Sequence, residues 1–236
     1  MLIGAHRGAF KDTPSLDENS MAAFKRAIEF KCDYVEFDVH KTLDGKFVIH
    51  HDEFLSFNNQ KFNLKNTSWN GFLEKYTLPI TNEKLPLLED VISICNKKIK
   101  MNVEIKDPTI GSEVVEVMLR SGVSAQDFFI SSFHQSVLMD ISRSHKEIYL
   151  GFLFMGNPWS IKNAKLAKNF SCKSINPYYK FLNKKLLNFA LKNNLEVHSW
   201  TVNGKAIDKI MRLESITSII TNDVLDALAK RDELKS

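Results

Sequence analysis

Short apolar runs alternate with amphipathic stretches along the whole chain, and this rhythm restricts the fold more than any other feature. Eight apolar runs have the length of strands, and each is followed by a stretch with helical periodicity. The strands are predicted at 2–5, 33–39, 99–105, 128–131, 148–152, 173–176, 195–202 and 218–221. The helices are predicted at 20–31, 88–96, 111–121, 135–144, 160–169, 184–192, 204–213 and 224–234.

Eight strand–helix pairs within 236 residues predict an α/β fold, the TIM (β/α)8 barrel, as one domain over residues 1–236. A doubly wound parallel sheet is the alternative. It would normally use fewer strands, and no Gly-x-Gly-x-x-Gly follows the first predicted strand. The barrel therefore accounts better for the pattern.

The alternation of predicted strands and helices is interrupted from about residue 53 to residue 85, where the sequence shows little periodicity. We expect a small insertion after the second strand region, which at the active end of a barrel usually shapes the substrate pocket. Its large apolar side chains can contact an acyl chain or form a small hydrophobic cap. They are Phe54, Leu55, Phe57, Phe62, Trp69, Phe72 and Leu73.

The charge pattern argues against a nucleic-acid partner. The formal net charge is +4, only six of the basic residues are arginine, and the lysines are scattered. A protein that binds nucleic acid more often has its basic residues, arginines among them, clustered along one face. There is no charged-then-apolar leader and no apolar run near 20 residues, so we expect no membrane span and a cytoplasmic protein. The expected partner is a small-molecule substrate, and a homodimer is left open.

Three acids share strand faces in a way that predicts a metal site. The strand period of two turns Glu36 and Asp38 to one face, and Glu104 has the same placement on the next barrel strand. Buried carboxylates repel each other and lose solvation, which a divalent cation offsets. Oxygen ligands suit Mg²⁺ or Ca²⁺, with Mn²⁺ as a further candidate. Alternatively, Lys106 or Arg7 pairs with the acids and no metal binds.

His6 and His51 are the candidate proton carriers, since they flank the acid pair in the sequence. General acid–base catalysis needs one group to deprotonate the nucleophile and another to protonate the leaving group, and two imidazoles can do both near neutral pH. The alternative is a hydrogen-bonded structural role. His50 alternates with His51 along the chain, and His40 continues the acidic face. We leave both outside the catalytic set.

Five ordered motifs in the first 52 residues, and weaker ones later, give the chain a resemblance to a known family. The chain resembles the glycerophosphodiester phosphodiesterases, enzymes of glycerol and lipid metabolism, over nearly its whole length. The motifs are His6-Arg7-Gly8, Glu18-Asn19-Ser20, Glu36-Phe37-Asp38-Val39, Thr42-Leu43-Asp44-Gly45, His51-Asp52, Glu104-Ile105-Lys106, Ser131-Ser132-Phe133 and Trp200-Thr201-Val202-Asn203.

The resemblance implies metal-dependent hydrolysis of glycerophosphodiesters to an alcohol and sn-glycerol 3-phosphate. It implies attack by the neighbouring glycerol hydroxyl through a cyclic phosphate, which benefits from the high effective concentration of a tethered group. Trp200 is either a wall against the alcohol or part of the core. The other implied roles are the acid–base pair His6 and His51, the metal ligands Glu36, Asp38 and Glu104, and the phosphate contacts Arg7 and Lys106.

Two positions depart from the family pattern. Asp17 stands where a proline usually precedes Glu18, and Val224 stands where a proline often follows Asn222-Asp223. Because proline fixes φ, the first change can alter the loop before the first helix. Two rival functions also stay open: a lysophospholipase D-type activity on lysophospholipids, and a non-catalytic barrel that binds glycerophosphodiesters or lipid.

Overall fold

Eight parallel strands close into a barrel in the computed structural model, which describes residues 1–12, 14–156 and 160–235. The barrel closes because β1 pairs with both β11 and β2. This confirms the predicted TIM barrel, and the doubly wound alternative is wrong. The barrel strands are β1 (Leu2–Ala5), β2 (Tyr34–Lys41), β6 (Lys100–Ile105), β7 (Phe128–Ser132), β8 (Tyr149–Phe154), β9 (Ser174–Pro177), β10 (Glu196–Ser199) and β11 (Ser218–Thr221).

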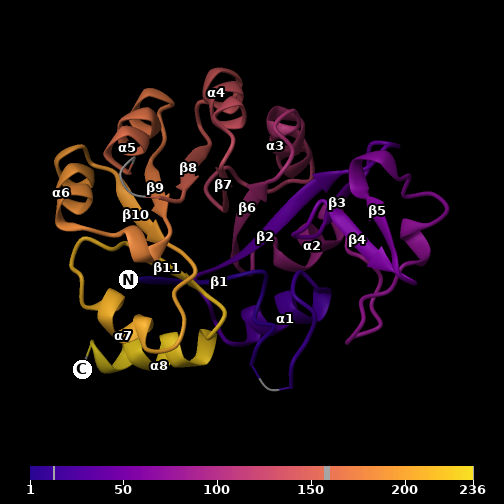
Figure 1. Ribbon diagram of the computed structural model, residues 1–236, viewed down its shortest axis with the longest axis horizontal. Helices are drawn as coiled ribbons and strands as arrows, with labels where there is room; N and C mark the ends of the chain where they lie inside the picture. Colours follow the sequence, from indigo (N-terminus) through magenta and orange to yellow (C-terminus); the bar gives the residue numbers. More distant parts are fainter. Residues whose placement is uncertain (13, 157–159, 236) are drawn as a thin grey trace.

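The helices lie outside the ring of strands (Figure 1) and bury their apolar faces against it. Polar caps fix two helix starts: the Ser20 hydroxyl accepts from the backbone N–H of Ala23, and the Asn183 side chain accepts from that of Leu186. Across the described ranges, no helix is long and apolar enough to cross a membrane. The helices are α1 (Met21–Glu29), α2 (Leu88–Cys95), α3 (Gly111–Arg120), α4 (Gln135–Ser144), α5 (Ser160–Asn169), α6 (Lys184–Lys192), α7 (Ala206–Met211) and α8 (Val224–Glu233).

The apolar run before the double histidine is a short strand outside the barrel. β3 (Phe47–Ile49) pairs antiparallel with the end of β2, so that Val39 faces Ile49. The chain reverses between the two strands in a turn where Gly45 has a φ of +83°, which favours glycine. The reversal brings the backbone N–H of His50 to the carbonyl of Asp38 at 3.0 Å. The histidines are thereby returned to the carboxyl end of β2.

The insertion begins with a hairpin that the weak sequence periodicity did not predict. β4 (Phe54–Phe57) pairs antiparallel with β5 (Gln60–Asn63), and the two residues of the turn, Asn58 and Asn59, both have positive φ. Two 3-10 turns follow, at Leu64–Asn66 and Leu73–Lys75. Apolar residues of the segment form a separate buried cluster together with Val48 of β3: they are Leu55, Leu64, Leu73, Tyr76, Leu78 and Leu85.

Asp17 ties the insertion to the loop before α1. Its buried carboxylate accepts hydrogen bonds from the backbone N–H groups of Ile80 and Thr81 and from the Thr81 hydroxyl, at 2.7–3.2 Å. The Glu83 carboxylate accepts from the N–H of Ala22 at 3.1 Å. Asp17, which stands where the family pattern has proline, therefore accepts hydrogen bonds that a proline side chain could not accept.

Replacing Asp17 with alanine should destabilise the protein by about 1.5–3 kcal/mol, because two backbone donors lose a charged acceptor. Chemical denaturation measures the loss, and hydrogen exchange should quicken at Ile80 and Thr81. The exposed Glu214→Ala variant is the control and should change stability by less than about 0.5 kcal/mol. Equal stability of the two variants would contradict this role of Asp17.

Candidate active site

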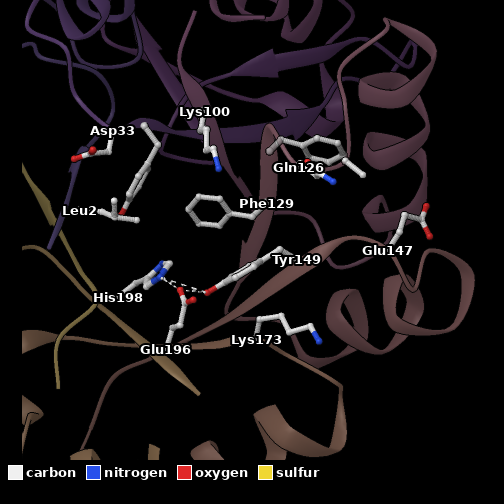
Figure 2. Close-up of a pocket in the computed structure, with 13 residues that line it drawn as sticks. Leu2, Asp33, Lys100, Gln126, Phe129, Glu147, Tyr149, Lys173, Glu196 and His198 are labelled. Carbon is white, nitrogen blue, oxygen red and sulfur yellow. Dashed lines mark hydrogen bonds and ion pairs between the residues drawn. The ribbon is translucent and has the colours of Figure 1, made fainter. Parts of the chain in front are cut away.

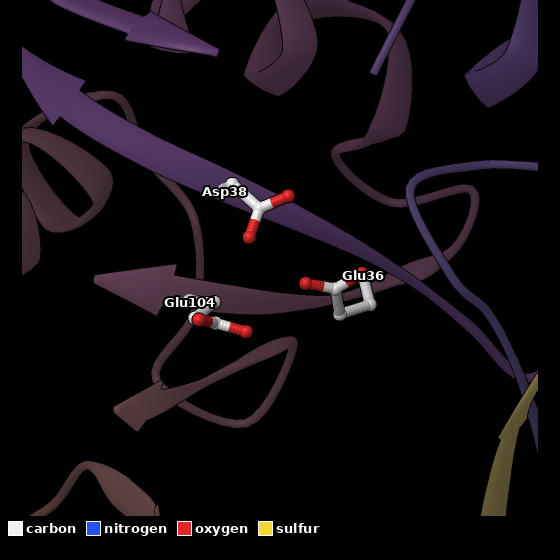
Figure 3. A group of neighbouring side chains, drawn as sticks. All are labelled: Glu36, Asp38 and Glu104. Carbon is white, nitrogen blue, oxygen red and sulfur yellow. The ribbon is translucent and has the colours of Figure 1, made fainter. Parts of the chain in front are cut away.

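Three carboxylates converge at the carboxyl ends of two adjacent strands (Figure 3). In the β2–β6 register Asp38 faces Glu104 directly, and Glu36 lies two residues earlier on the same face. One oxygen from each of the three lies within 4.8 Å of the others. Glu36, Asp38 and Glu104 are only 2%, 1% and 9% exposed. The parallel pairing thus produces the cluster that the strand periodicity predicted.

Burial and mutual repulsion disfavour the ionised form of two of these acids. Burial, together with the charges of Asp38 and Glu104, raises the pKa of Glu36 well above its usual value. Burial and the charge of Asp38 raise the pKa of Glu104 to about 7. Burial also acts on Asp38, but Lys106 and Arg7 outweigh it and lower its pKa to about 2. Asp38 is the acid that the nearby cations compensate.

Two side-chain cations reach into the cluster. Lys106 Nζ lies 3.2 Å from an oxygen of Asp38 and 2.7 Å from one of Glu104. Arg7 Nε lies 3.5 Å from Asp38, while its Nη1 donates to Glu18 at 2.8 Å. These contacts agree with the alternative in which Lys106 or Arg7 pairs with the acids and no metal binds. Two unit charges nevertheless face three carboxylates, and Glu36 has no cationic side chain bonded to it in the described residues.

Two buried oxygen atoms, one in the acidic cluster and one next to it, have no hydrogen-bond partner among the described residues. They are Glu36 Oε1 and Asn19 Oδ1. Burying a polar oxygen without a partner is unfavourable, and oxygen atoms are the ligands that hard divalent cations prefer. The acidic cluster therefore fits a metal ion, which would satisfy Glu36 where the lysine and the arginine do not.

The turn after β1 presents backbone and side-chain donors to these acids. Arg7 and Gly8 both have positive φ, and a Cβ at Gly8 would lie 2.7 Å from the Cβ of Ala23, so only glycine fits. The backbone N–H of Arg7 donates to Glu36 at 2.9 Å. The Asn19 amide donates to Asp38 at 2.9 Å. The motif Glu18-Asn19-Ser20 alone does not reveal this role, because nothing near Asn19 in the sequence shows that its amide reaches Asp38.

His6 has a defined orientation beside the acids. Its Nδ1 lies 2.6 Å from Asn222 Oδ1, and its Nε2 lies 4.0 Å from Glu36. With Asn222 accepting, Nδ1 carries the proton and Nε2 keeps its lone pair. Burial, assisted by Arg7, lowers the pKa of His6 to about 4, so the ring is neutral at pH 7. Asn222, more than two hundred residues away along the chain, was not among the predicted site residues.

His51 is more open to solvent and is held by its neighbours. Its Nδ1 lies 2.7 Å from the Asp52 carboxylate. His40 Nε2 lies 3.2 Å from the backbone carbonyl of His51. A positive charge on His51 would lower the pKa of both His6 and Asp38, which indicates that His51 belongs to the same group. His40 therefore supports the backbone of His51, whereas His50 contributes its backbone N–H to Asp38.

Trp200 lies just beyond the carboxyl end of β10, within an aromatic group. Its Nε1–H donates to the carbonyl of Asn176 at 2.7 Å, and its ring contacts Phe133 and Tyr178 with centroids 5.4 and 5.3 Å away. None of the described contacts joins Trp200 to the acids. Among the insertion's apolar residues, Leu55 and Leu73 are buried in its own cluster, while Phe54 and Phe57 are 40% and 42% exposed.

Comparisons with known proteins point to one family. The sequence profile of the Glycerophosphoryl diester phosphodiesterase family matches residues 6–226. A glycerophosphodiester phosphodiesterase of Caldanaerobacter subterraneus subsp. tengcongensis is 29% identical, with 94% of each chain covered. A protein of Mycoplasma genitalium is 31% identical, with 86% of this chain and 87% of its own covered.

Solved structures agree on the fold. A glycerophosphodiester phosphodiesterase from Parabacteroides distasonis superposes with a TM-score of 0.83 at 20% identity, covering 100% of this chain and 98% of that one. An Oleispira antarctica phosphodiesterase, solved with the product sn-glycerol-3-phosphate, gives 0.82 at 20% identity, covering 98% and 97%. Together with the family profile, these matches place the chain in the glycerophosphoryl diester phosphodiesterase family, and it is a phosphoric diester hydrolase.

Proposed function

We propose that this protein hydrolyses glycerophosphodiesters to an alcohol and sn-glycerol 3-phosphate, with one divalent metal ion held by Glu36, Asp38 and Glu104. Mg²⁺ and Ca²⁺ are the favoured ions, and Mn²⁺ is also suitable. The observation that carries the proposal is the buried carboxylate cluster with a neutral, oriented His6 at its edge. A product-bound relative of the same fold supports the substrate class.

The two histidines divide the proton transfers. Nε2 of neutral His6 accepts the proton of the substrate hydroxyl next to the ester as its oxygen attacks phosphorus. His51, whose Nδ1 lies 2.7 Å from the Asp52 carboxylate, donates a proton to the departing alcohol oxygen. The cyclic phosphate is then opened by water with the roles reversed, which restores both histidines. Tethering the nucleophile to the ester removes much of the entropy loss of a bimolecular reaction.

The remaining groups bind and orient the phosphate. A bound divalent ion would stabilise negative charge on the nonbridging oxygens. The Lys106 ammonium, beside Asp38 and Glu104, and the Arg7 guanidinium, beside Asp38, can hold the phosphate. Trp200, with Phe133 and Tyr178, forms a wall for the alcohol moiety. We also propose that residues 1–236 act as one domain, because Asp17 and Glu83 bond the insertion to the barrel side.

His6→Ala and His51→Ala should each lower kcat for glycerophosphocholine by about 10²–10⁴-fold, the usual contribution of general acid–base catalysis. A coupled assay for released glycerol phosphate measures the rates. His145→Ala, at the end of α4, is the matched control and should stay near wild type. Full activity in either active-site variant would contradict the assigned roles.

Asn222→Ala should lower kcat at least about tenfold with little change in KM, because the partner of a catalytic histidine selects its tautomer. Ring ¹⁵N shifts of His6 should show loss of the Nδ1–H tautomer. Asn188→Ala, on the exposed face of α6, is the control. An unchanged His6 tautomer in Asn222→Ala would show that Asn222 does not set it.

Chelator-treated protein should bind one equivalent of Mg²⁺, Ca²⁺ or Mn²⁺ in a calorimetric titration, and activity lost in chelator should return with the ion. Glu104→Gln should weaken metal binding at least about tenfold, since it removes a ligand charge. Glu113→Gln, whose carboxylate pairs with Lys41, is the control. Full activity in chelator, with no heat of binding, would favour the pairing of the acids with Lys106 and Arg7 without a metal.

Binding of glycerophosphocholine without turnover in the presence of any of the three ions would favour the alternative of a non-catalytic binding barrel.

A further inference from the structure

A cavity of about 490 Å³ lies at the end of the barrel away from the acids, and Figure 2 shows the residues that line it. Its lining comes from the amino ends of the strands: Leu2 on β1, Tyr34 on β2, Lys100 on β6, Phe129 on β7 and Tyr149 on β8. On β2, Tyr34 precedes Asp38 by four residues, which corresponds to about 13 Å along a strand. The cavity is therefore separate from the acidic cluster.

Four aromatic rings form the inner wall of this cavity. The ring centroids are 5.2 Å apart for Tyr34 and Phe129, 5.5 Å for Phe129 and Tyr149, and 5.9 Å for Tyr149 and His198. Gly4 makes room for this group, since a Cβ there would lie 2.2 Å from the Tyr34 ring. Aromatic faces and edges arranged in this way favour contact with another flat aromatic molecule.

The polar ends of these rings are already bonded within the protein. The Tyr34 hydroxyl lies 2.6 Å from Ser218 Oγ. The Tyr149 hydroxyl donates to Glu196 at 2.7 Å, and His198 Nε2 lies 3.1 Å from the same carboxylate oxygen. These bonds fix the ring orientations. The wall is thus rigid before anything binds, which lowers the entropy lost on binding.

One lysine places a positive charge next to the aromatic wall. Lys100 and Lys173 line the cavity, and neither has an ion-pair partner within the described part of the chain. Figure 2 shows the Lys100 side chain extending from the rim toward Phe129. Three carboxylates also line the cavity. Asp33 pairs with Arg231 at 2.6 Å, Glu196 accepts the bonds from Tyr149 and His198, and Glu147 lies 3.7 Å from His145, a pair that is ionic only when the histidine is protonated. Lys100 is therefore the cation that an anionic group at the aromatic wall can reach.

We propose that this cavity binds a small planar aromatic molecule carrying one anionic group, such as a carboxylate, sulfonate or phosphate. The rings of Phe129 and Tyr149 contact the flat body, and Lys100 holds the anion. The volume suits a molecule of one or two rings. This site is independent of the diesterase chemistry and would persist if the proposed reaction were wrong.

The test uses naphthalene-2-sulfonate as the probe and the full chain in ¹H–¹⁵N NMR titrations. We expect saturable shifts of the backbone amides of Lys100, Phe129, Tyr149 and His198. The Lys100→Gln/Lys173→Gln double variant should raise the Kd for the sulfonate about fivefold, since exposed ion pairs are individually weak. Its Kd for neutral 2-naphthol should stay within about twofold. Lys192→Gln, on the exposed face of α6, is the control and should leave both constants unchanged.

Three results would overturn the proposal. The first is the absence of saturable shifts at these amides. The second is binding that shifts only the insertion or the carboxyl end of the barrel. The third is an equal loss of affinity for the sulfonate and for 2-naphthol in the double variant, because Lys100 would then not be recognising the anion. Glycerophosphocholine hydrolysis should be unchanged in the double variant, which separates this site from the acidic cluster.

Discussion

Burying three carboxylates against two side-chain cations is the constraint on which the rest of the site depends. Glu36, Asp38 and Glu104 lie within 4.8 Å of one another with almost no contact with solvent. Lys106 and Arg7 compensate Asp38 well, as its lowered pKa of about 2 indicates, but they leave Glu36 with a raised pKa and an unpartnered oxygen. That imbalance is unfavourable in the protein alone and suits a dication.

The barrel supplies the geometry that makes this arrangement stable. Parallel pairing of β2 with β6 sets the acids side by side, and the left-handed turn at Arg7 and Gly8 brings a backbone donor to Glu36. The reversal through β3 returns His50 and His51 to the same end. The three acids lie on strands, and backbone hydrogen bonds at Arg7 and His50 fix the turns that carry the other groups.

Much of the fold and part of the active site could be predicted from the sequence, because the alternation of side chains along each strand is regular. The eight barrel strands and their helices follow the apolar pattern to within a few residues, and Glu36 and Asp38 share a face for the same reason. The β4–β5 hairpin was missed because its strands are four residues each and its turn uses two asparagines with positive φ. The pairing of Asn222 with His6 could not be predicted from local pattern, since only barrel closure brings β11 beside β1.

The central claim is most directly tested by a crystal structure of the protein grown with Mn²⁺ and sn-glycerol 3-phosphate, measured with anomalous scattering. We predict one anomalous peak at about 2.0–2.4 Å from oxygens of Glu36, Asp38 and Glu104, with the phosphate between that ion and the His6 ring. Absence of a peak, with Lys106 still bonded to Asp38 and Glu104 at saturating Mn²⁺, would contradict the account.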